Sequence, residues 1–153
     1  MLNRRMKLTA VMILVFVLLM SAMALGAYEP FKVKLGLFDR MVCLAILPPE
    51  GSYATLKIVR ELQMELAPTE EENIKAGLIS DLISGGVTID DPDDPEKGWD
   101  AVEPKEIIFG DIAKGIIVAA LEKLNDAEKL TQQHVNLYAI FVEGKIEDEK
   151  EGE

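Results

Sequence analysis

The residues with the greatest capacity for chemistry are carboxylates crowded into one segment, DDPDDPEKGWD, which begins at Asp90. Carboxylates at this density can bind a hard cation such as calcium, and the weak candidate ligands are Asp91, Asp93, Asp94 and Glu96. The EF-hand spacing fails, because a count from Asp91 puts a proline at position five and Glu96 where the turn glycine belongs. We favour a solvated acidic loop and predict no metal and no other cofactor. A metal-dependent enzyme that uses this loop is kept as an alternative function.

One cysteine and one histidine are the other reactive candidates. Cys43 and His134 can form a nucleophilic pair only if the fold brings them together. Cys43 lies in an apolar stretch and is interpreted as a small buried hydrophobic residue. His134, three residues after Thr131, suits an exposed first turn of a helix. The sequence contains no GxGxxG, GxxxxGK[ST], HExxH, GxSxG or paired CxxC motif. We therefore predict no catalytic residue and a protein that is not an enzyme.

An uncharged apolar run, residues 8–28, follows three basic residues, Arg4, Arg5 and Lys7. A basic start, an apolar stretch and small residues near a cleavage point are the parts of a signal peptide. The run is also long enough for a transmembrane anchor. The sequence therefore predicts a signal peptide or a membrane anchor over residues 1–27, with the body outside the cytoplasm in either case.

The body is strongly acidic. Three of the 16 basic residues and none of the 27 acidic residues precede residue 28, so the remainder holds 13 basic residues against 27 acidic. Such a body repels phosphate backbones. We therefore predict that nucleic acid is not a partner, and that the protein contacts a membrane through its N-terminal segment and an unidentified protein through its body.

The apolar spacing of the body predicts a helix-dominant α+β fold, with a small central β-hairpin or three-stranded sheet flanked by helices. The hairpin is expected around Gly85-Gly86. The predicted strands and helices follow in chain order: strand 31–35, helix 37–47, helix 52–66, helix 69–76, hairpin 78–90, strand 106–109, helix 111–124 and helix 131–142. These elements form one domain over residues 28–142, and residues 143–153 form an acidic tail predicted to be disordered.

Several residues are expected to fix the helix ends. Thr69 and Glu72 have the spacing of a capping box. Asp111 is predicted to be the N-cap of its helix, and Ile112 is placed on the buried stripe of that helix.

Trp99, at the end of the acidic loop, is expected to fold back on the core. Three basic residues of the first two helices, Arg40, Lys57 and Arg60, are predicted to form ordinary ion pairs rather than a basic surface.

Four stretches carry a resemblance that spans residues 34–142: LFDRMVCLAILPPEGSYATLKIVREL, PTEEE, KEIIFGD and KLTQQHVNLYAIFVE. Over them the body resembles small uncharacterised proteins of bacteriophage and prophage gene clusters. The resemblance implies a shared fold and brings no catalytic residue. Members of that family begin near the equivalent of KLGLFDR, and a valine codon can start a bacterial gene. An alternative is therefore a cytoplasmic phage accessory protein that begins at Val33.

The sequence thus favours a non-enzymatic interaction protein of phage origin, exported or membrane-anchored. Its partner surface is expected to include exposed apolar parts of the last two helices.

Overall fold

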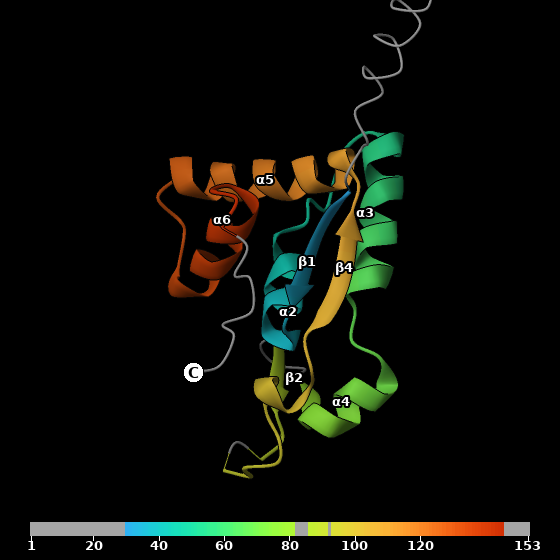
Figure 1. Cartoon of the computed structure of the whole chain (residues 1–153), viewed down its shortest axis with the longest axis vertical. Coiled ribbons are helices and arrows are strands. Elements are labelled where there is room, and N and C mark those ends of the chain that lie inside the picture. The colour runs from blue at the N-terminus through green and yellow to red at the C-terminus, as the bar shows by residue number, and fades with distance from the viewer. Residues whose placement is uncertain (1–29, 82–85, 92, 146–153) are drawn as a thin grey trace, which may run out of the picture.

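A computed structural model describes residues 30–81, 86–91 and 93–145 of the chain, and the fold is a helix-dominant α+β fold, as predicted (Figure 1). The predicted leader, residues 1–27, and most of the predicted acidic tail lie outside these residues. No helix within the described ranges is long and apolar enough to cross a membrane. The elements in chain order are β1 (Phe31–Leu35), α2 (Leu37–Ile46), α3 (Tyr53–Leu66), α4 (Glu70–Ala76), β2 (Leu78–Asp81), β3 (Gly86–Ile89), β4 (Lys105–Phe109), α5 (Asp111–Asp126) and α6 (Val135–Phe141), with short 3-10 turns at Trp99–Ala101 and Gln132–His134.

The strands form two separate antiparallel pairs. β2 and β3 pair with each other as the expected hairpin requires, and residues 82–85, on which its predicted turn falls, lie outside the described residues. The third predicted strand does not join that hairpin, because β4 pairs with β1, with Phe31 opposite Phe109 and Leu35 opposite Lys105. Both strands bury every second residue. In the observed register the buried residues of the two strands lie on the same face of the sheet, as Val33 and Ile107 do.

The main core lies between the β1–β4 pair and the helices α2, α3, α5 and α6. In Figure 1, α3 and α6 lie on opposite sides of the two strands and α5 crosses their upper end. Phe31, Phe109 and Phe141 form an aromatic cluster, with ring centroids 5.1 to 6.2 Å apart. The ammonium of Lys114 lies 4.0 Å from the centre of the Phe31 ring. Phe31, at the first position of β1, therefore joins the first strand to both α5 and α6.

A smaller apolar cluster holds the lower part of the molecule together. Leu37, Ala76 and Val102 are buried in it, and Trp99 packs against it. The Trp99 ring meets the Phe38 ring edge to face, with centroids 5.4 Å apart. The prediction that Trp99 folds back on the core is therefore confirmed, and this contact ties the end of the acidic loop to α2.

The helix ends agree with the sequence in part. Ser52 caps α3, and Thr69 and Glu72 form the predicted capping box of α4. The prediction for α5 was wrong by one residue, because Gly110 is the N-cap and Asp111 is the first helical residue. The Asp111 carboxylate, in the first turn, still interacts favourably with the positive end of the helix dipole. Ile112 was wrongly placed on the buried stripe, since its side chain is 68% exposed.

Candidate functional site

Two carboxylates of the acidic loop, those of Asp91 and Asp94, are turned toward their own backbone. Asp91 Oδ1 accepts a hydrogen bond from the Asp93 N–H at 3.3 Å, and Asp94 Oδ1 accepts one from the Glu96 N–H at 3.0 Å. Asp94 also lies 3.8 Å from the Lys97 ammonium. Among the residues that the structure describes, no group of three or more His, Cys, Asp or Glu side chains is arranged to hold a metal.

Trp99 lies at the end of the acidic loop and packs on Phe38. Its fluorescence should therefore change if an ion rearranges the loop. We expect that adding calcium or magnesium up to about 1 mM, the weak end of calcium-module affinities, leaves its fluorescence without a saturable change. The measurement is a titration at constant ionic strength, with sodium chloride as the control. A saturable response that sodium does not reproduce would restore the metal-dependent alternative.

Cys43 and His134 do not have the character of a nucleophilic pair. Burial, together with the nearby Asp39 charge, raises the pKa of the Cys43 thiol to about 12. The thiol therefore stays protonated at neutral pH, whereas a nucleophilic cysteine needs a lowered pKa. The Nδ1 atom of His134 accepts a hydrogen bond from the Thr131 N–H at 3.0 Å. Each residue thus has a structural role, and Cys43 is the buried hydrophobic residue that the sequence predicted.

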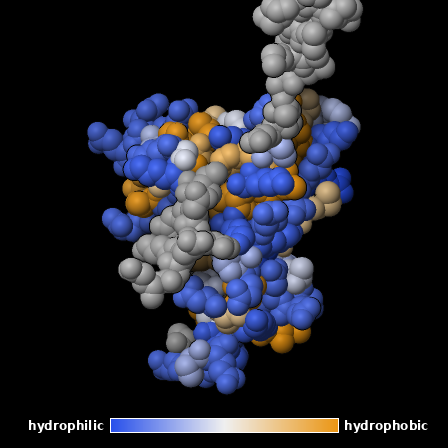
Figure 2. Space-filling model, viewed as in Figure 1, coloured by the Kyte–Doolittle hydropathy of each residue, from blue (hydrophilic) through white to orange (hydrophobic). Residues whose placement is uncertain are grey.

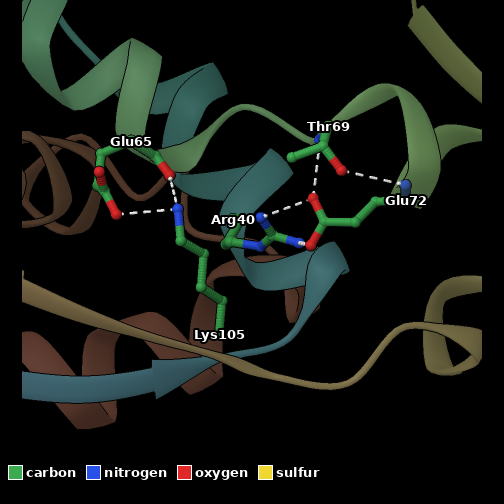
Figure 3. A network of polar contacts seen from close by, with 5 residues as sticks. All are labelled: Arg40, Glu65, Thr69, Glu72 and Lys105. Carbon is green, nitrogen blue, oxygen red and sulfur yellow. Dashed lines mark hydrogen bonds and ion pairs between the residues drawn. The ribbon is translucent and has the colours of Figure 1, made fainter.

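The sequence did not predict that a basic residue would lie in the core. Arg40 of α2 is fully buried, and its guanidinium donates to both carboxylate oxygens of Glu72, at 2.6 and 3.2 Å (Figure 3). Glu72 Oε2 also accepts from the Thr69 N–H at 2.8 Å. Partial burial alone would raise the pKa of Glu72, but the hydrogen bonds from Arg40 and Thr69 outweigh it and hold the pKa below its usual range. This pair therefore fixes α4 against α2. The predicted ion pairing is therefore found for Arg40, although its pair is buried, whereas Lys57 and Arg60 have no ion-pair partner in the described part of the chain.

A second ionic contact joins β4 to the end of α3. Lys105 Nζ donates to the backbone carbonyl oxygen of Glu65 at 2.9 Å and lies 2.9 Å from the carboxylate Oε1 of the same residue (Figure 3). That carbonyl belongs to the last turn of α3, where no further turn supplies an N–H donor and a cation is favourable. Lys105 therefore fixes the spacing between α3 and the start of β4.

Beyond this contact, α3 and β4 form the walls of an open groove of about 560 Å³, which the start of α5 closes at the other end. Figure 2 shows apolar surface where β4 passes between α3 and the beginning of α5. Ile108 and Ile112 are 57% and 68% exposed there. The groove is lined by Ile58, Glu61, Leu62 and Glu65 of α3, by Ile107 and Ile108 of β4, and by Gly110, Asp111, Ile112 and Ala113.

The charge of the groove is negative. Glu61, Glu65 and Asp111 line it together with four isoleucines, and no basic residue among those that the structure describes does. Glu65 is paired with Lys105 at one end. Glu61 and Asp111 have no ion-pair partner within the described part of the chain. An apolar floor with unpaired carboxylates on its rim is a surface that can bind a partner.

The last two helices, which are expected to carry the partner surface, each expose an apolar residue. Ile112 of α5 is exposed and lines the groove, whereas Val135 of α6 is exposed but does not line it. Comparison with protein-family models, with curated protein sequences and with solved structures finds no match.

Proposed function

We propose that this protein is a non-enzymatic interaction protein, exported or held at a membrane by its N-terminal segment, which binds a protein partner through the groove between α3, β4 and the start of α5. The observation that carries the proposal is the groove itself. Ile108 and Ile112 are exposed beside Glu61 and Asp111, whose carboxylates have no ion-pair partner among the described residues. Exposed apolar residues that gather in a concave, charged surface are typical of a binding site.

The remaining reactive groups support an interaction role. The Cys43 thiol is buried and protonated, and the carboxylates of Asp91 and Asp94 accept hydrogen bonds from the backbone of their own loop. The resemblance of residues 34–142 to phage and prophage proteins favours an accessory role. The acidic body disfavours nucleic acid as the partner.

Site-specific photo-crosslinking in the native cells tests the groove. We expect a photoreactive phenylalanine at position 112, in the groove, to give a discrete adduct with one protein. The control places the same residue at position 122, which is exposed on α5 ten residues, or about 15 Å, further along the helix. Absence of an adduct from position 112, or the same adducts from both positions, would overturn the proposal.

The export part is tested on the same cells by fractionation and N-terminal sequencing. An N-terminus near residue 28 outside the cytoplasm indicates a cleaved signal peptide, and an intact chain in the membrane fraction indicates an anchor. A cytoplasmic chain that begins at residue 33 would contradict export and support the cytoplasmic phage accessory protein.

A further inference from the structure

We infer that the groove binds an extended, basic segment of a partner protein, which adds as a strand to the free edge of β4. This inference rests on the proposed function and names the chemistry of the partner.

The first observation is the free edge itself. β1 and β4 form a two-stranded sheet, so each strand has one edge that pairs with no other strand in residues 30–81, 86–91 and 93–145. A free edge presents a row of backbone N–H and C=O groups that a further extended chain can pair with. The free edge of β4 lies on the side of α3, because β1 occupies the other side (Figure 1). The groove is therefore bounded by a strand edge on one side and a helix on the other.

The second observation is the length and the ends of the groove. The Lys105–Glu65 contact closes it at the start of β4, and Gly110 to Ala113 close it beyond the end of that strand. β4 has five residues, which at about 3.3 Å per residue give an edge of roughly 17 Å. A partner strand of about five residues matches this edge.

The third observation is the pattern of side chains. Apolar residues Ile58, Ile108 and Ile112 contribute to the lining from three different elements. Glu61 and Asp111 lie among them without an ion-pair partner in the described ranges. A strand that alternates apolar and basic residues satisfies both features, since its apolar side chains cover the isoleucines and its cations meet the carboxylates.

Charge also excludes the chain's own C-terminal segment as the occupant. The last eight residues, IEDEKEGE, carry five acidic residues and one basic residue. Such a segment is repelled by Glu61 and Asp111.

The test measures binding of three labelled, capped heptapeptides to the full chain in a neutral detergent by fluorescence anisotropy. The first peptide alternates Val and Lys, beginning and ending with Val. The second has Glu in place of Lys. The third has Pro in place of the third and fifth residues of the first peptide, which keeps the charge but removes two backbone donors. We expect the Val-Lys peptide to bind at least about tenfold more tightly than either of the others, a factor equal to about 1.4 kcal/mol.

Two matched variants separate the groove from general attraction to an acidic body. Glu61→Lys changes a groove carboxylate, and Glu122→Lys makes the same change of net charge on an exposed part of α5 that does not line the groove. We expect Glu61→Lys to weaken Val-Lys peptide binding about tenfold or more and Glu122→Lys to weaken it less than about threefold. Amide hydrogen exchange gives an independent readout, because strand addition slows exchange within residues 105–109.

Equal binding of the Val-Lys and proline peptides, or equal effects of the two variants, would overturn strand addition. Absence of peptide binding, or unchanged exchange in β4, would overturn it as well. If crosslinking from position 112 still succeeds in that case, the proposed function stands and only the strand-addition mode fails. If crosslinking fails while the peptide binds as expected, the groove has the inferred chemistry but the cellular role is wrong.

Discussion

Replacing Glu72 with glutamine is expected to lower the free energy of unfolding by about 3 kcal/mol, because removal of one partner from a buried ion pair leaves the other charge uncompensated. Arg40 is fully buried, and its Nε atom has no hydrogen-bond acceptor in the described part of the chain. A guanidinium does not lose its proton inside a protein, so the charge remains. Urea unfolding followed by Trp99 fluorescence measures the change.

Thr69→Ala is the matched control for the Glu72 variant. It removes the hydroxyl that accepts the Glu72 N–H at 3.2 Å and leaves the ion pair in place. Loss of a helix cap lowers stability by about 1 kcal/mol. If the glutamine variant loses no more than the alanine variant, Arg40 does not depend on the Glu72 charge.

The pH dependence of the same pair has a definite sign. The folded-state pKa of Glu72 lies below its usual range despite partial burial, because Arg40 and Thr69 donate hydrogen bonds to it. The contribution of the Glu72 charge to the free energy of unfolding is therefore fully present above the unfolded-state pKa, about 4.3. This contribution is lost as the pH falls through the folded-state pKa. The stability difference between the wild type and Glu72→Gln should be constant from about pH 7 to pH 5 and shrink below about pH 4.5. A difference that is unchanged at pH 2 would contradict the assignment.

A chain that begins at Val33 is expected to be about 3 kcal/mol less stable than one that begins at Tyr28, a loss typical of deleting a large aromatic side chain from a packed cluster. The shorter chain lacks Phe31, whose ring lies 5.4 Å from that of Phe141 and 6.2 Å from that of Phe109. It also lacks Lys32, which pairs with Ile108 in the β1–β4 ladder. For a domain of this size the melting temperature should fall by about 10 °C.

Phe31→Ala in the chain that begins at Tyr28 separates the two contributions. We expect this variant to show most of the loss, since the ring contacts account for more of it than the strand pairing at the edge of the ladder. Melting followed by circular dichroism compares the three chains. If the chain that begins at Val33 melts at the same temperature as the longer one, residues 31 and 32 do not belong to the folded domain, and the cytoplasmic alternative gains support.

The local signals in the sequence were sufficient to predict most of the secondary structure. Alternation predicted the strand that begins at Phe31, and Ser52, Thr69 and Glu72 marked the starts of two helices, because caps and alternation depend on residues a few positions apart. Ile112 was misplaced because the helical period was extended through the first turn of α5. There the helix end borders an open groove instead of the core.

The candidate site was not predictable in the same way. The groove combines Glu61 of α3 with Ile108 and Asp111, which lie more than 40 positions further along the chain. Arg40 likewise finds its partner 32 residues away. No local pattern specifies such contacts, since they follow from how the helices pack on the β1–β4 pair. The sequence did contain one clue, an acidic residue followed at once by an isoleucine at the start of α5.

The pairing of β1 with β4 determines the order in which the domain can fold. Leu35 and Lys105 are adjacent in the ladder but 70 positions apart in the chain, so the sheet cannot close until β4 has left the ribosome. At about 5–20 residues per second, the first strand waits on the order of 4–14 s for its partner. During that interval Val33 and Leu35 lack the neighbours that later bury them. Contacts of such high sequence separation also slow the search for the native state, which gives a chaperone time to act on the nascent chain.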